Sequence, residues 1–122
     1  MSYAPEYYGG GGVVTFDGES LRITRSDTYA GVTFTVTQDF AGYTGLLTIR
    51  HRVTGAELMQ VAVTVVNATT LTADMTASDT AFTLLVALSE FGPHPFDIQM
   101  TAGATVSTPI AGVAVIRKDQ TT

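Results

Sequence analysis

The stretch GVTFTVT, residues 31–37, decides the fold class of this chain. The apolar side chains of Val32, Phe34 and Val36 alternate with threonines. Successive side chains of a β-strand point to opposite faces, so this alternation places the apolar residues on one face and the threonines on the other. β-Branched and aromatic residues also favour strands. The stretch therefore predicts a β-strand with one buried face.

The same alternation recurs along the chain, and it predicts strands over residues 32–36, 46–52, 58–66 and 96–100. We expect Phe34, Ile49, Val63 and Ile98 to meet in one core. The last apolar segment is nearly continuous, which favours a central or covered strand. The segments with this pattern are LRITR (21–25), TGLLTIRHR (44–52), ELMQVAVTVV (57–66), TTLTADM (69–75), PFDIQMT (95–101) and IAGVAVIRK (110–118).

Turn residues separate these segments. Asp17-Gly18 predicts a two-residue hairpin, and Thr54-Gly55 joins two strong strand patterns. Asn67-Ala68 is a further predicted turn, and Gly92-Pro93 ends the segment before it. Seven or eight short strands at regular spacing predict an all-β fold, an antiparallel β-sandwich over residues 13–119. Residues 120–122 remain as a tail.

The segment SDTAFTLLVALSEFG, residues 78–92, fits two structures. Its leucines recur at helical spacing after a Ser78 or Asp79 N-cap, while Phe82 and the alternate residues after it recur at strand spacing. We expect one short helical link that begins near Asp79.

The order of these segments resembles the immunoglobulin-like β-sandwich domains of tailed-phage virion structural proteins, the type at the N-terminus of baseplate upper proteins. In that family a short turn precedes the first strong strand, where this chain has Ser26-Asp27-Thr28. A second turn, matched by residues 41–44, precedes a strand that ends in Ile49-Arg50. Residues 76–81 match a Thr-, Ser- and Asp-containing link. The resemblance covers residues 21–118 and implies an immunoglobulin-like fold and a virion setting. The longer N-terminal segment and the longer link after Ala81 depart from the family pattern.

Composition excludes several classes of function. The 122 residues are enough for one domain with its own core, and the chain has no cysteine for a disulfide or thiolate site. A net charge of −5 with only six Lys and Arg argues against nucleic-acid binding, which needs a basic surface. No apolar run approaches the length of a membrane span, and the first residues lack the positive and apolar regions of a signal peptide. We therefore expect neither membrane contact nor export. Charged residues make up 14% of the chain, which suggests that another subunit covers part of its surface.

The glycine run Gly9, Gly10, Gly11 and Gly12 raises the question of a phosphate site. A Walker loop needs a Lys directly after its last glycine, and here valines follow. A dinucleotide fingerprint needs a strand before it and a helix after it, which this position lacks. We therefore interpret the run as a hinge, because glycine chains are flexible.

The sequence contains no other motif that predicts catalysis or metal binding. His51 and His94 are far apart in sequence, and a metal site would need carboxylates from elsewhere. There is no nucleophile elbow and no predicted pair of buried carboxylates. We expect no enzymatic activity, no catalytic residue, no cofactor and no metal.

The first twelve residues form a predicted docking arm. Tyr3, Pro5, Tyr7 and Tyr8 supply contact area with polar tips, as tyrosines do in interfaces, and residues 1–12 cannot bury them alone. A loose terminus is the alternative interpretation.

The resemblance and the arm together predict a non-enzymatic virion protein that is assembled in the host cytoplasm. A compact body with a latch favours a capsid decoration, or cement, protein that contacts the major capsid subunits and forms a homo-oligomer on the particle. Attachment at the tail, baseplate or fibre base is the alternative. A carbohydrate-binding module for the host surface is a second alternative, although the chain has no Trp for an aromatic platform.

Overall fold

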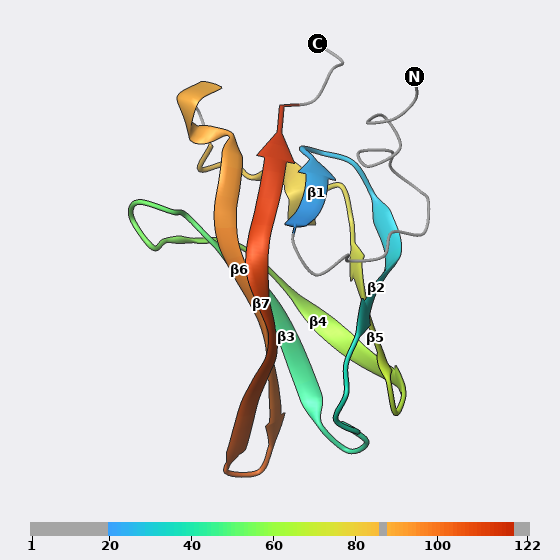
Figure 1. Ribbon diagram of the computed structural model, residues 1–122. Helices are drawn as coiled ribbons and strands as arrows, with labels where there is room; N and C mark the ends of the chain where they lie inside the picture. Colours follow the sequence, from blue (N-terminus) through green and yellow to red (C-terminus); the bar gives the residue numbers. More distant parts are fainter. Residues whose placement is uncertain (1–19, 86–87, 119–122) are drawn as a thin grey trace.

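The computed structural model describes residues 20–85 and 88–118, which form a curled β-sheet (Figure 1). The all-β prediction is confirmed. Two short 3-10 turns, η2 (Asp79–Ala81) and η3 (Leu88–Glu90), lie between the fifth and sixth strands. The strands are β1 (Ser20–Thr24), β2 (Tyr29–Thr35), β3 (Thr44–Arg50), β4 (Glu57–Asn67), β5 (Thr70–Met75), β6 (Gly92–Ala102) and β7 (Thr105–Arg117).

One continuous seven-stranded sheet carries the order β1-β7-β6-β3-β4-β5-β2. The long strand β4 holds its two halves together: its first half pairs with β3 and its second half with β5. Val63 is the shared position, opposite Gly45 on one side and Ala73 on the other. The sheet therefore curls at β4, and Figure 1 shows β4 crossing behind β6 and β7 toward β5 and β2 on the right.

The core fills the space inside this curl. Phe34, Ile49, Val63 and Ile98 are all buried in one cluster, as the alternation of apolar residues predicts. Phe34 comes from β2 and Phe96 from β6, and their ring centroids lie 6.3 Å apart. This contact joins the two halves of the sheet. The four predicted strands are present, although β2 ends one residue before Val36 and β3 ends at Arg50.

The prediction of a purely antiparallel sheet is wrong at β1, which pairs with β7 in parallel. All other neighbours in the sheet are antiparallel. After β1 the chain crosses to the opposite edge of the sheet, so no hairpin sets the direction of β1 against its neighbour. An alternating pattern specifies which face of a strand is buried, and it carries no information on strand direction.

The single helical link is also corrected, because the segment forms 3-10 turns instead of one helix. The first turn begins at Asp79, as expected, but Phe82 adopts a left-handed backbone with φ 48° and ends it. Phe82 and Leu85 are both buried, whereas Leu84 is 52% exposed. Burying these two side chains in the core takes precedence over the helical spacing of the leucines.

Two glycines stand at positions where a side chain would be unfavourable. Gly55 lies in the predicted turn between β3 and β4 with φ +75°, a left-handed conformation that glycine adopts readily. Gly45 lies where β3 passes close to two neighbours. A Cβ there would lie 2.5 Å from the Met100 sulfur and 3.1 Å from the Val63 Cβ.

At the predicted turn at Asn67, the Asn67 side chain accepts a hydrogen bond from the Thr69 N–H at 2.9 Å. The Asp17-Gly18 hairpin falls outside the described residues.

Candidate functional site

The β7-β6-β3-β4 half of the sheet presents one face to the core and the opposite face to the outside. We call the second one the outer face. It consists of the side chains that alternate with the core residues on these four strands. Its members are Thr44, Leu46, Thr48 and Arg50 on β3, Gln60 and Ala62 on β4, Pro93, Pro95, Asp97, Gln99 and Thr101 on β6, and Val106, Ala111, Val113 and Val115 on β7.

The outer face is nearly free of charge. Among the residues defined above only Arg50 and Asp97 are charged. Four further charged residues border it: Arg22 on β1 beside Val115, Arg117 at the end of β7, Arg52 beside Pro93 and Pro95, and Glu57 on β4 opposite Arg50. The face and its borders therefore carry more positive than negative charge, while the whole chain carries −5.

Three of the exposed large apolar side chains stand on this face. Leu46 is 45% exposed, Val113 is 37% exposed and Val106 is 58% exposed. Leu46 lies between Ala62 on β4 and Gln99 on β6. It therefore projects from the middle of the face.

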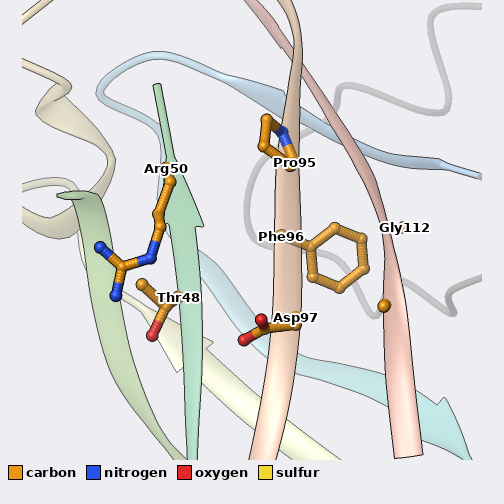
Figure 2. Close-up of a pocket in the computed structure, with 7 residues that line it drawn as sticks. Thr48, Arg50, Pro95, Phe96, Asp97 and Gly112 are labelled. Atoms are coloured by element: carbon orange, nitrogen blue, oxygen red, sulfur yellow. The ribbon is translucent and has the colours of Figure 1, made fainter. Parts of the chain in front are cut away.

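Small residues leave hollows in the outer face. The first has a volume of about 240 Å³ and lies over Pro95 and Asp97 of β6, between β3, with Thr48 and Arg50, and the small residues at positions 111–112 of β7. Figure 2 shows the carboxylate of Asp97 pointing from β6 toward Thr48 on β3.

A second hollow, of about 340 Å³, lies beside Leu46 over Gly45 and Ala62. The first hollow contains a hydroxyl, a carboxylate and a guanidinium, and the second adds only neutral groups. The Thr48 hydroxyl accepts a hydrogen bond from the Gln60 amide at 3.1 Å. Within residues 20–85 and 88–118, no group of three His, Cys, Asp or Glu residues could hold a metal ion.

A second polar arrangement lies at the end of this half of the sheet. His51 and His94 have ring centroids 5.1 Å apart and are both buried. With Arg52 and Glu90 they form what we call the histidine cluster. The Arg52 guanidinium donates to the carbonyls of Ser89 at 2.6 Å and Pro93 at 3.0 Å. Arg52 therefore ties the end of β3 to η3 and to the start of β6.

Each imidazole accepts a backbone hydrogen bond at its Nδ1. The Nδ1 of His94 accepts from the backbone N–H of Arg52 at 3.1 Å, which favours the proton on Nε2, 2.7 Å from the Glu90 carbonyl; the Arg52 guanidinium lies 3.0 Å from the same Nε2. The Nδ1 of His51 accepts from the Val53 N–H at 3.1 Å. Its Nε2 makes no hydrogen bond and lies 3.4 Å from a carboxylate oxygen of Glu90.

Burial lowers the pKa of His94 below its usual value, and the nearby positive charge of Arg52 lowers it further. His94 is therefore neutral in the folded protein at pH 7. Above a pH of about 6.5 both the folded and unfolded forms are neutral at this position. As the pH falls below that value, the unfolded chain takes up a proton that the folded chain resists, so stability decreases toward acid.

The sequence placed the two histidines far apart, and the structure brings them together. β3 pairs with β6 so that Ile49 lies opposite Phe96, which extends to His51 and His94. The spacing of the two histidines in the sequence does not indicate that they are neighbours, because their contact depends on how the two strands pair.

Pro93 and Pro95 lie in the part of β6 that pairs only with β7. A strand position with one neighbour tolerates the missing N–H of proline.

The predicted arm cannot be compared with the structure. Tyr3, Pro5, Tyr7 and Tyr8 and the hinge glycines 9–12 lie outside the described residues. The other two tyrosines serve the core. Tyr29 is 1% exposed, and its hydroxyl accepts from the Thr24 N–H at 2.8 Å. The ring of Tyr43 packs edge-on against the ring of Phe40, with 5.2 Å between the ring centroids.

Comparison with known proteins assigns no family. A scan against protein-family models finds none that matches the chain. No curated protein sequence matches it. In the described part of the chain, no helix has the length and apolar character needed to cross a bilayer.

Proposed function

We propose that this chain is a non-enzymatic structural protein of a tailed-phage particle, a capsid decoration protein that acts through protein–protein contacts. The outer face carries this proposal. It is a broad sheet surface with few charges, exposed aliphatic side chains and hollows between them. Interfaces are depleted of charge at their centres and use apolar anchors, which is the composition of this face.

The strand order supports an immunoglobulin-like sandwich. In that fold strands C, F and G form one sheet, and strands B, E and D are neighbours in the other. Here β3, β6 and β7 are neighbours in the order C-F-G, and β2, β5 and β4 in the order B-E-D. β4 supplies the last strand of one layer and then joins the other, so the two layers are continuous.

Contacts between two of the segments that resemble phage domains also support the proposal. The Thr80 hydroxyl, in the link of residues 76–81, donates to the Asp27 carbonyl at 2.6 Å. The Ser26 N–H donates to the Thr80 carbonyl at 2.9 Å. Ser26 has a left-handed backbone, φ 68°, and Thr80 is fully buried. The turn and the link are thus one structural unit, which gives a physical reason for their joint occurrence.

Capsid decoration remains our preference, and attachment at the tail, baseplate or fibre base remains the alternative. The outer face would serve either place on the virion, and assembly in the host cytoplasm fits both. A carbohydrate-binding module gains less support, because the exposed large apolar residues of the described part are all aliphatic. Sugar recognition would use an exposed aromatic ring instead.

Quantitative mass spectrometry of purified particles tests the proposal. The chain should be present in many copies per particle, in fixed proportion to the major capsid protein. Recombinant protein should also rebind to particles that lack it. A Leu46→Lys variant, which places a charge on the outer face, should rebind more weakly. Val53→Lys is the matched control, because Val53 is 79% exposed in the β3–β4 loop, away from the face. Absence of the chain from purified particles would refute the proposal.

A further inference from the structure

We infer that the histidine cluster is an acid-sensitive clasp: it fixes the β3–β4 turn and η3 to the end of the sheet while both imidazoles are neutral, and it releases them in acid. This device lies within the chain and needs no partner, so it is independent of the proposed function. Three features of the cluster carry it: the hydrogen bonds of the two imidazoles, their burial, and the charges that face them.

Two consecutive backbone N–H groups just after β3 donate to histidine nitrogens. The N–H of Arg52 donates to Nδ1 of His94 at 3.1 Å, and the N–H of Val53 donates to Nδ1 of His51 at 3.1 Å. A neutral imidazole has one nitrogen that accepts a hydrogen bond, whereas an imidazolium carries hydrogen on both nitrogens and accepts none. Protonation of either ring therefore removes a hydrogen bond that holds the β3–β4 turn.

The dependence on protonation is strongest at His94, because Arg52 approaches both of its ring nitrogens. The backbone N–H of Arg52 faces Nδ1, and the guanidinium lies 3.0 Å from Nε2. An imidazolium at His94 would point hydrogen atoms at donors on both sides and would place a second positive charge beside the guanidinium. The carbonyl of Glu90, 2.7 Å from Nε2, would still accept a hydrogen bond, so protonation breaks the contact between His94 and Arg52.

Contacts between η3 and the sheet use the same residues. Ser89 is exposed and Glu90 is half-buried. The Arg52 guanidinium donates to the carbonyl of Ser89 at 2.6 Å and to that of Glu90 at 3.3 Å. Polar contacts at an exposed site open locally at a lower free energy than a buried core unfolds. Loss of the contact between His94 and Arg52 therefore loosens η3 before the sheet itself unfolds.

The charges that face the two rings come from the end of β3 and from η3. Burial lowers the pKa of His94, and the charges of Arg52 and His51 lower it further, whereas Glu90 acts in the opposite direction. The Glu90 carboxylate lies 3.4 Å from Nε2 of His51, and its side chain is 34% exposed, so solvent screens this attraction. The ring centroids are only 5.1 Å apart, so a charge on one imidazole disfavours a charge on the other.

The other neighbours of the cluster bring no negative charge to it among the described residues. β7 places uncharged Ala114 opposite His94. Arg25 lies over the ring of Phe91, at the junction between η3 and β6, with 5.3 Å from its guanidinium carbon to the ring centroid. The closed clasp therefore takes up a proton at His94 less readily than the open one. As the pH falls below about 6.5, proton uptake shifts the equilibrium toward the open form.

Amide hydrogen exchange of the full chain, followed by NMR from about pH 7.5 to about pH 5.0 and corrected for intrinsic rates, tests the clasp. The Arg52 and Val53 amides should be less protected than those of buried Leu47 and Ile98 at every pH, because they exchange through the local opening. Protection at Arg52 should fall by up to about tenfold per pH unit below 6.5. This loss should follow the titration of the His94 ring signals.

Asparagine variants separate the two rings. The side-chain oxygen of Asn stands at the same position relative to Cβ as Nδ1 of His, so it accepts the same backbone N–H without titrating. His94→Asn should abolish the pH response at Arg52, and the double variant with His51→Asn should abolish it at Val53 as well. Asp97→Asn removes a carboxyl group on β6 outside the cluster and should leave the response unchanged.

Protection at Arg52 equal to that of the core amides would overturn the inference, because the contact would then open only on global unfolding. Protection that stays constant down to about pH 5.0, or a response that persists in the double variant, would overturn it too. If a variant does not fold, the wild-type chain decides: His94 ring signals that titrate without any change at the Arg52 amide contradict a clasp.

Discussion

Replacing Phe34 by alanine should remove the contact that joins the two halves of the curled sheet. Phe34 is fully buried on β2, and its ring packs against Phe96 of β6 with an interplanar angle of 48°. β2 is an edge strand whose one neighbour in the sheet is β5. The side chain therefore connects two parts of the sheet that no backbone hydrogen bond joins directly.

The expected cost is about 3–5 kcal/mol of unfolding free energy, the usual range for truncating a buried Phe to Ala. That range includes the loss of the aromatic pair, about 0.5–1.5 kcal/mol. For a domain of this size the melting temperature should fall by roughly 10–20 °C. Thr35→Ala is the matched control on the same strand: Thr35 is exposed, so the change should stay within about 0.5 kcal/mol.

Urea unfolding followed by circular dichroism, with melting curves as a second readout, measures both variants. A loss of less than about 1 kcal/mol for Phe34→Ala would refute the reasoning, because the ring would then not lie in a close-packed core. An equal loss for Thr35→Ala would show that β2 has its other face buried.

The remaining predictions concern the histidine cluster, the β3 crossing, the arm and ligands. As the pH falls below about 6.5 the wild-type unfolding free energy should decrease, because the folded chain resists protonation of His94, and His94→Gln should flatten this dependence; an unchanged slope would contradict it. Gly45→Val should cost about 1–3 kcal/mol by overpacking against Met100 and Val63, measured by urea unfolding, and a neutral effect would contradict it. Deleting residues 1–8 should leave the melting temperature nearly unchanged and weaken rebinding to particles; failure to fold would show that these residues belong to the core. Calorimetric titration with ATP or Zn²⁺ should give no micromolar binding, and a clear isotherm would reveal a missed site.

The alternation of apolar residues and threonines predicted which face of each strand is buried. Burying one face of a pleated strand requires that alternation, and Phe34, Ile49, Val63 and Ile98 follow it. The same signal could not predict that β1 runs parallel to β7, because direction depends on how the chain crosses between distant strands.

The link between β5 and β6 shows a second limit of the sequence. Leucines at helical spacing predicted a helix there, yet Phe82 and Leu85 are buried through a left-handed turn. Tertiary packing overrides a local preference that is worth only tenths of a kcal/mol per residue.

The candidate site was the least predictable part. The outer face gathers residues from four strands, and its pair of opposite charges appears only after the register brings Arg50 and Asp97 to one hollow. The histidine cluster likewise depends on the pairing of β3 with β6. The predicted arm tyrosines remain a prediction.

The most direct test of the central claim is a cryo-electron microscopy reconstruction of the intact particle at a resolution that traces this chain. The account predicts density for the sheet at regularly repeated positions, with Leu46 and the outer face covered by another polypeptide. On the capsid this density would follow the symmetry of the shell. Particles without such density, or with the outer face of every copy open to solvent, would contradict it.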